Sequence, residues 1–193
     1  MGNKLAEIAE RVRTVREILD ITLEDMAQFT NLSVEEYLAF ESGEKDFTFT
    51  FLYRCSEKFG IDMIELLTGE RPKLSFYSIV RKDKGLPMSR RDGFTYNHLA
   101  YLFQDKTGEP FLVNAPYREE EQHREIELSY HEGQEFDYIL RGSLKVRMED
   151  HIEVLHEGDA IYYNSGHGHG MIATEGEDCL FLAVVMKPQE EKE

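Results

Sequence analysis

Cysteine and long apolar runs are both scarce in this sequence. Its two cysteines, Cys55 and Cys179, lie far apart within apolar stretches. We therefore expect two buried thiols and no disulfide, as suits a reducing compartment. No apolar run approaches the ~18 residues that a membrane span requires, and the N-terminal stretch has no signal-peptide core. These absences predict a cytoplasmic protein without a membrane partner.

Positive charge is also scarce. The chain carries 22 lysines and arginines against 38 aspartates and glutamates, a net charge of −16. This surplus favours solubility and argues against free electrostatic attraction to nucleic acid or anionic membranes. With 193 residues the chain fits two small domains or one larger one, and its 41% hydrophobic content suffices for a core in each.

The first third of the chain has the periodicity and capping residues of short helices. The expected helices cover residues 4–19, 23–29, 33–41, 47–59 and 62–67. We expect Thr22 to cap the second helix and Ser33 to cap the third, with Glu36 completing a capping box. The second and third helices are joined by a tight turn, which is the arrangement of a helix-turn-helix.

This part of the chain, roughly residues 5–70, resembles the helix-turn-helix domains of phage-repressor (Xre) type. The likeness rests on Arg-x-x-Arg-Glu in the first helix, on Thr-Leu-Glu-Asp-Met-Ala, and on Glu-Ser-Gly-Glu, in which Ala27, Glu41 and Gly43 occupy the most recognisable points. In that family the third helix enters the major groove of DNA. The resemblance implies DNA contacts from Thr22, Ser33, Val34, Glu35, Tyr37 and Lys45.

The charge of this segment leaves DNA binding open. Residues 1–72 hold eight lysines and arginines against fifteen aspartates and glutamates, a net charge of −7. Glutamates near phosphates weaken binding, although a glutamate can read the amino group of cytosine. A basic stretch at 73–91 could still reach the DNA backbone. Otherwise the helical domain is a packing or substrate-gating module.

After a linker at about 70–74, the chain consists of short strand patterns separated by glycine turns. The expected strands cover residues 74–80, 95–103, 110–117, 125–130, 135–140, 143–148, 152–155, 160–163, 168–173 and 179–186. Many short strands at this spacing indicate an all-β sandwich or barrel. We therefore predict an α+β chain of two domains, all-α at 1–72 and all-β at 73–189, with an acidic tail at 190–193.

Two stretches of the β half bring metal-ligating residue types into regular spacing. His131 and Glu135 lie four residues apart and are followed by Gly142. If the chain is extended there, an even separation places both side chains on one face. About thirty residues further on, a second stretch contains Gly158 and ends in His169.

These stretches resemble the paired motifs of the cupin superfamily, His-x-His…Glu…Gly followed by Gly…Pro-x-Gly…His…Asn. In this chain Ser129 replaces the first histidine, Asn164 replaces the proline and Ala173 replaces the final asparagine. The resemblance implies a double-stranded β-helix, or jelly-roll, barrel. It also implies that the two remaining motif histidines and the glutamate share a site.

Two imidazoles and one carboxylate, from His131, Glu135 and His169, form a facial set that suits Fe(II), with Mn, Ni or Zn as alternatives. A degenerate cupin whose polar residues only line a ligand cavity is the competing interpretation. His167 lies close enough to be an alternative ligand. The remaining histidines lack a motif, so we expect surface or loop positions for His98, His123, His151 and His156.

Several polar side chains could bind a ligand inside the barrel, although ordinary core packing would also explain the tyrosines among them. The candidates are Tyr96, Asn97, Ser129, Tyr138 and Tyr163.

Two functions compete for this layout. A helix-turn-helix followed by a cupin is typical of transcription regulators in which the first domain binds DNA and the second binds a small effector. Such proteins pair as homodimers or homotetramers, which would present two half-sites. The layout also resembles the hydroxypropylphosphonate epoxidase family, mononuclear iron enzymes that likewise lack the first cupin histidine and have a substrate-side tyrosine near the position of Tyr96. A non-catalytic storage module is a third option.

Overall fold

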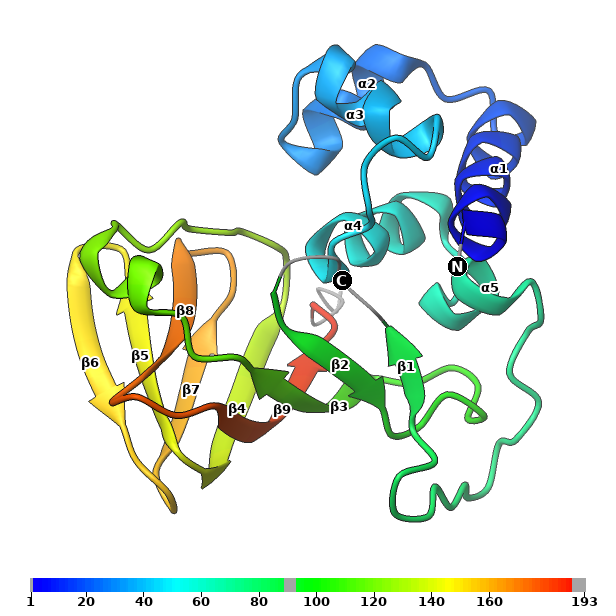
Figure 1. Ribbon diagram of the computed structural model, residues 1–193. Helices are drawn as coiled ribbons and strands as arrows, with labels where there is room; N and C mark the ends of the chain where they lie inside the picture. The colour runs from blue at the N-terminus through cyan, green and yellow to red at the C-terminus, as the bar shows by residue number, and fades with distance from the viewer. Residues whose placement is uncertain (1, 89–92, 189–193) are drawn as a thin grey trace, which may run out of the picture. The chain divides into compact units, whose positions relative to one another are not determined.

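The structure is a computed structural model that describes residues 2–88 and 93–188. It divides into a helical unit, residues 1–77 with 102–105, and a β unit, residues 78–101 with 106–193 (Figure 1). The predicted combination of an all-α domain and an all-β barrel is confirmed. The expected tail at 190–193 and the end of the basic stretch, 89–91, lie outside the described residues. Among the helices described, none combines the length and the apolar character of a membrane span.

The described part of the helical unit consists of α1 (Gly2–Ile18), α2 (Leu23–Thr30), α3 (Val34–Glu41), α4 (Phe49–Phe59) and α5 (Met63–Thr68). The two predicted caps are confirmed. The Thr22 hydroxyl accepts a hydrogen bond from the Asp25 N–H at 3.1 Å. Ser33 and Glu36 form the reciprocal capping box, which satisfies two of the N–H groups at the start of α3. Both helices of the helix-turn-helix therefore begin where the sequence predicts.

An ion pair between the half-buried Arg16 and the buried Glu41 joins α1 to α3. Arg16 donates to Glu41 through Nε at 2.7 Å and through Nη2 at 3.1 Å. The Tyr37 hydroxyl donates to the same carboxylate at 2.9 Å, and Tyr37 itself is fully buried. Stacked rings of Phe40 and Phe51, 4.2 Å apart, extend this core to α4. These contacts fix α3 against the rest of the unit.

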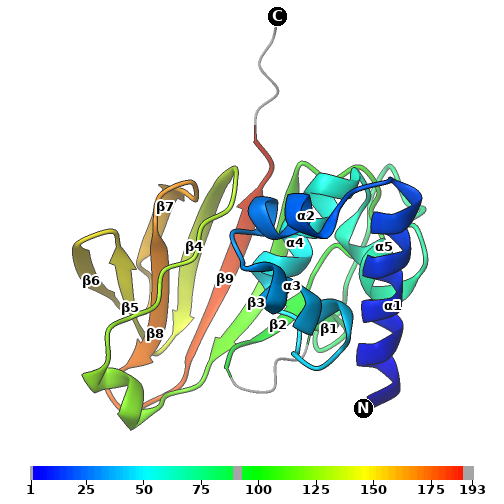
Figure 2. The ribbon, with the colours of Figure 1, turned by 90° about the horizontal axis from the view of Figure 1, so that it is seen from above.

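The β unit contains two antiparallel sheets within the described residues. The strands are β1 (Leu86–Met88), β2 (Thr95–His98), β3 (Gly108–Ala115), β4 (Gln134–Arg141), β5 (Ser143–Met148), β6 (His151–Leu155), β7 (Ala160–Asn164), β8 (His169–Thr174) and β9 (Cys179–Met186). One sheet has the order β1-β2-β3-β9-β4-β7 and the other the order β6-β5-β8. Figure 2 shows how β9 runs between β3 and β4 in the larger sheet.

Two predicted strands are wrong. Over residues 74–80 only Leu74 makes a bridge, to Phe103, and Phe76 is 89% exposed. The apolar residues here have no sheet face to cover, so their composition misled the strand prediction. Over residues 125–130 only Ser129 pairs, with His169. The short β1, which the sequence analysis placed in a loop, pairs with β2 instead.

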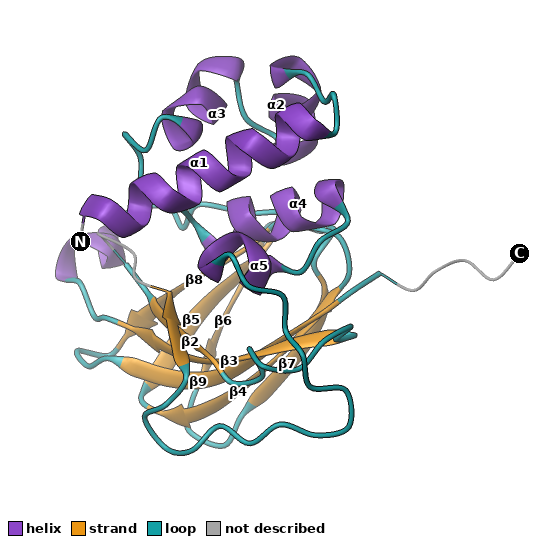
Figure 3. Cartoon of the chain, turned by 90° about the vertical axis from the view of Figure 1, so that its right-hand side faces the viewer, coloured by secondary structure: helices purple, strands orange, loops and turns teal. Residues whose placement is uncertain are grey.

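The core of the β unit lies between the two sheets, whose strands are orange in Figure 3. Along β4 the residues Glu135, Asp137 and Ile139 are buried, whereas the residues between them are more exposed. The same alternation holds along β3 and β9. This period of two defines an inner face, and the side chains on it surround the residues described next.

Candidate metal centre, ligand cavity and DNA-contacting face

His131, Glu135 and His169 converge inside the barrel, as the sequence predicts. Their ligand atoms all lie within 4.8 Å of one another, and all three residues are buried. The spacing predicts that His131 and Glu135 share one strand, but they do not. A bend with φ of +93° at Gly133 separates His131 from β4, and the two side chains still meet at 3.2 Å.

Local pairing explains how His169 reaches this position. Ser129 and His169 exchange backbone hydrogen bonds of 2.8 and 3.1 Å, which hold the segment before His131 against the start of β8. Glycines flank His169 on both sides. A Cβ at Gly170 would overlap the backbone carbonyl of Glu127, whereas a Cβ at Gly168 would meet only the ends of the Tyr130 and Leu128 side chains. The close crossing therefore requires glycine at position 170.

Backbone carbonyls fix the orientation of both imidazoles. His131 Nδ1 lies 3.0 Å from the Glu132 carbonyl oxygen, and His169 Nδ1 lies 2.9 Å from the His167 carbonyl oxygen. A carbonyl only accepts, so each Nδ1 carries a hydrogen and each Nε2 presents a lone pair toward the shared centre. This is the arrangement that metal-ligating histidines commonly have.

The contact between His131 and Glu135 supports a cation at this centre. With Nδ1 protonated, the Nε2 of a neutral His131 is an acceptor, and it faces a carboxylate oxygen at 3.2 Å. Two acceptors at this distance need a shared proton or a metal ion between them. The donor set of two nitrogens and one oxygen, closely spaced and buried, therefore fits a divalent transition metal.

Ser129, Tyr163 and Tyr96 lie beside this centre. The Ser129 hydroxyl is 3.3 Å from His169 Nε2, and it stands where the cupin motif has its first histidine. The ring of Tyr163 lies 5.1 Å from that of His169. Tyr96 interacts electrostatically with Tyr163, and it pairs with the buried Val113, so it lies on the inner face.

Asn97 and Tyr138 do not belong to the cavity, and their prediction as ligand contacts is wrong. Each is one position away from an inward-facing residue on its own strand, so each points to the opposite face. Tyr138 is accordingly 38% exposed. Glu135 and Tyr138 have an odd separation, which already placed them on different faces if both lie in a strand.

Asp137 is the inner-face residue near Glu135 that the sequence pattern did not bring out. It is fully buried, two residues after Glu135 on the inner face of β4, and the Tyr163 hydroxyl donates to its Oδ2 at 3.3 Å. Burial, and then the nearby charge of Glu135, raises the pKa of Asp137 well above its ordinary value. Burial also raises the pKa of Tyr163, so the phenol stays protonated and donates. The period of two from Glu135 could have identified Asp137.

His98 belongs to a second buried cluster, so the expectation of a surface position is wrong for it. The Ala100 N–H donates to His98 Nδ1 at 2.9 Å, which leaves the hydrogen on Nε2. That hydrogen is donated to Glu109 Oε2 at 2.5 Å, and Lys106 Nζ lies 3.8 Å from the same oxygen. His123, His151 and His156 are exposed, as expected.

In the helical unit, most of the predicted DNA contacts lie at the surface. Thr22, Ser33, Glu35 and Lys45 are exposed and Val34 is half-buried. Tyr37 is fully buried, so its prediction as a DNA contact is wrong, and its hydroxyl serves the Arg16–Glu41 pair instead. Position 37 follows the inward period of α3, and this explains its burial.

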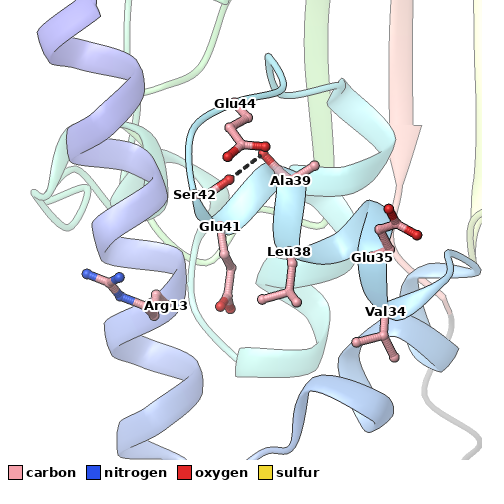
Figure 4. A pocket seen from close by; sticks show the side chains of 8 residues that line it. All are labelled: Arg13, Val34, Glu35, Leu38, Ala39, Glu41, Ser42 and Glu44. Atoms are coloured by element: carbon pink, nitrogen blue, oxygen red, sulfur yellow. Dashed lines mark hydrogen bonds between the residues drawn. The ribbon is translucent and has the colours of Figure 1, made fainter.

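A shallow hollow lies on the outer side of α3, between it and α1 (Figure 4). Its lining residues are Arg13, Val34, Glu35, Leu38, Ala39, Glu41, Ser42 and Glu44. Its only cation is Arg13, which pairs with Glu10 at 3.2 Å. Sequence-independent attraction to phosphates is therefore weak on this face, and Lys45 supplies the positive charge next to it.

Comparison with known domains agrees with this geometry. Residues 9–72 match the model of a helix-turn-helix domain, and residues 118–185 match that of a cupin domain. The chain thus combines an Xre-like helix-turn-helix with a cupin, and the resemblance drawn from the motifs is confirmed.

Two kinds of relative have been described. Over 64 residues the chain is 38% identical to an uncharacterized HTH-type transcriptional regulator, YdeC, of Bacillus subtilis strain 168. That match covers 33% of this chain and 22% of the relative, so the chain spans about a fifth of the relative's length. An HTH_3 family transcriptional regulator from Vibrio cholerae has a similar fold, with a TM-score of 0.68 and 20% identity over 97% of this chain and 99% of that one.

The structure of hydroxypropylphosphonic acid epoxidase from S. wedmorenis gives a TM-score of 0.49 at 20% identity, over 96% of this chain and 100% of that one. At that level of overlap the comparison supports no conclusion about activity.

Proposed function

We propose that the chain is a DNA-binding transcription regulator whose cupin barrel binds a divalent metal and a small effector. The helix-turn-helix would contact an operator, and a homodimer would present two such domains to paired half-sites. Occupancy of the barrel would change the affinity of the helical unit for DNA.

One observation carries the sensing part of this proposal. In a chain that also has a helix-turn-helix, backbone carbonyls orient His131 and His169, and the ligand atoms of both lie within 4.8 Å of that of Glu135. The metal would be held by these three side chains, with coordination positions left open toward the cavity. When bound, it would supply a Lewis-acidic anchor for an anionic oxygen of the effector.

The DNA-binding part of the proposal is tested by selection. Full-length protein loaded with Mn(II) would be used to enrich duplexes from a random-sequence pool, followed by anisotropy measurements on the enriched duplex. We expect a specific sequence and a dissociation constant that changes at least about fivefold when the metal is removed. Failure to enrich any sequence would contradict operator binding. Enrichment without a metal effect would contradict the sensing mechanism alone.

Two lysines provide a matched pair of variants for this assay. The ammonium groups of Lys45 and Lys58 lie 4.9 and 5.2 Å from the ring centres of Phe40 and Phe29, so each loses a similar cation–π contact on truncation. Lys45 follows α3, whereas Lys58 is on α4. We expect Lys45→Ala to weaken binding to all duplexes and to reduce the salt slope by about one, and Lys58→Ala to leave both unchanged.

A second candidate function rests on the same three ligands. Two histidines and one carboxylate on one face are the ligand set of mononuclear non-haem iron oxygenases. The test is oxygen uptake by the Fe(II)-loaded chain in the presence of small carboxylates and phosphonates. Uptake that depends on the added compound and disappears in His131→Ala would favour an enzyme, whereas uptake equal to that of free Fe(II) would contradict it for these compounds.

A further inference from the structure

We propose that the barrel binds a small carboxylic acid that carries an ammonium or hydroxyl group two or three carbons from its carboxylate, and that Asp137 recognises this hydrogen-bond donor. The inference deepens the proposed sensing function and rests on metal binding by His131, Glu135 and His169. In this arrangement the carboxylate of the effector coordinates the metal and its donor group meets the Asp137 side chain.

The first observation is an unpaired oxygen in the cavity. Asp137 is fully buried, and its Oδ2 accepts from Tyr163, but its Oδ1 has no hydrogen-bond partner among the described residues. A buried polar atom without a hydrogen-bond partner lowers the stability of the fold. Such atoms are therefore found mainly where a bound ligand or water supplies the missing partner. A ligand ammonium group beside this carboxyl group favours its ionised form, in which both oxygens only accept hydrogen bonds, so the matching ligand group is a donor.

The position of Asp137 places this atom toward the metal centre. Asp137 and Glu135 are alternate residues on the inner face of β4, so their Cα atoms are about 7 Å apart and their side chains point the same way. The residue that pairs with Asp137 on β9 is Ala183, whose side chain is small. A ligand bound to the metal can therefore reach Asp137 with a chain of two or three carbons.

A second unpaired atom belongs to Ser165, whose backbone pairs with His131. The Ser165 hydroxyl oxygen is buried and has no partner within the described part of the chain. The backbone of Ser165 holds the segment of His131 in place, since the His131 N–H donates to the Ser165 carbonyl at 3.0 Å. Unsatisfied polar atoms next to the segments of two of the three ligands are expected of a site that a polar ligand completes.

Phenol and aromatic groups form the remaining walls. Tyr163 and Tyr96 bring hydroxyl groups to the inner face, and the ring of Tyr96 packs edge-on against Phe111 at 5.9 Å. No arginine is buried in the described part of the β unit, and its one buried lysine, Lys106, lies 3.8 Å from Glu109. The cavity therefore lacks a cation to bind a second anionic group, which favours a donor over a dicarboxylate.

The experiment uses the full chain loaded with Co(II), whose absorption spectrum reports changes at the metal. Three acids of similar size serve as probes: propionate, 3-hydroxypropionate and β-alanine. We expect β-alanine or 3-hydroxypropionate to bind at least about tenfold more tightly than propionate. Asp137→Ala should remove this preference and leave the affinity for propionate within about twofold. Retention of the cobalt spectrum would show that the variant keeps the metal centre.

Each result decides a different point. Equal affinity for the three probes in the wild-type chain would overturn the role of Asp137, even if the variant failed to fold. If the Asp137→Ala variant kept the preference over propionate, the preference would come from chelation of the metal, and this result would also overturn the role of Asp137. Absence of cobalt binding by the wild-type chain would overturn the metal centre itself and this inference with it.

Discussion

Replacing Arg16 with methionine is expected to destabilise the helical unit by about 3–5 kcal/mol, because it leaves a buried carboxylate without its cation. The Glu41 side chain is only 3% exposed, and it accepts two hydrogen bonds from Arg16. In the variant only the Tyr37 hydroxyl, at 2.9 Å, would still serve this charge. Methionine keeps the apolar stem, so packing is largely preserved, and the hydrogen bond from Arg16 to the Ile21 carbonyl at 3.1 Å is lost together with the ion pair.

The assay is urea unfolding followed by far-ultraviolet circular dichroism, which detects the helical unit because all α-helices among the described residues belong to it. Arg13→Met is the matched control, since Arg13 pairs with Glu10 at the surface, where the side chains are 46% and 68% exposed. We expect the control to cost less than about 1 kcal/mol. Adding Glu41→Gln to Arg16→Met removes the unpaired charge and should recover more than half of the loss. Equal effects of Arg16→Met and Arg13→Met would refute the reasoning.

Three further predictions concern a turn, a cap and the thiols. Gly142 and Gly158 both have positive φ, but only at Gly142 would a Cβ overlap a backbone carbonyl. Gly142→Ala should therefore destabilise the β unit by about 1–3 kcal/mol more than Gly158→Ala, as measured by thermal unfolding. Equal losses of stability would contradict this. Hydrogen bonds from Ser33 lower the pKa of Glu36, so its stabilising effect is present above the ordinary value of 4.5 and is lost as the pH falls through the lowered value. The stability difference between wild type and Ser33→Ala should therefore shrink in acid, and a constant difference would exclude Glu36 from the cap. Burial raises the pKa of Cys179 to about 11 and that of Cys55 well above its ordinary value, so neither cysteine should react rapidly with Ellman's reagent before unfolding.

The sequence predicted those features that depend on local chemistry. The caps at Thr22 and Ser33 follow from hydroxyl groups one residue before an apolar period, and the structure confirms both. The metal-type residues were found because turn glycines and ligand spacing agree in two motifs. The period of two along β4 also separates the two neighbours of Glu135: Asp137 lies on the same inner face, whereas Tyr138 lies on the opposite face and cannot contact a ligand in the barrel.

Other features depend on contacts that no local pattern contains. His98 is buried because Glu109, eleven residues later on the neighbouring strand, accepts its hydrogen. Residues 74–80 have the composition of a strand, but only Leu74 finds a partner, because pairing is decided by the rest of the fold. The motif position of Tyr37 predicted a DNA contact, but its side chain is buried and its hydroxyl donates to the Glu41 carboxylate, which pairs with Arg16.

The central claim is that His131, Glu135 and His169 hold one divalent metal ion, and metal content tests it most directly. Elemental analysis of the full chain after dialysis against Fe(II), Mn(II) or Co(II) would be compared for wild type, His131→Ala and His167→Ala. His167 is the matched control, because its side chain is 72% exposed and only its backbone carbonyl supports His169. We predict about one ion per chain in the wild type and in His167→Ala, and none in His131→Ala. Full occupancy in His131→Ala would contradict the account.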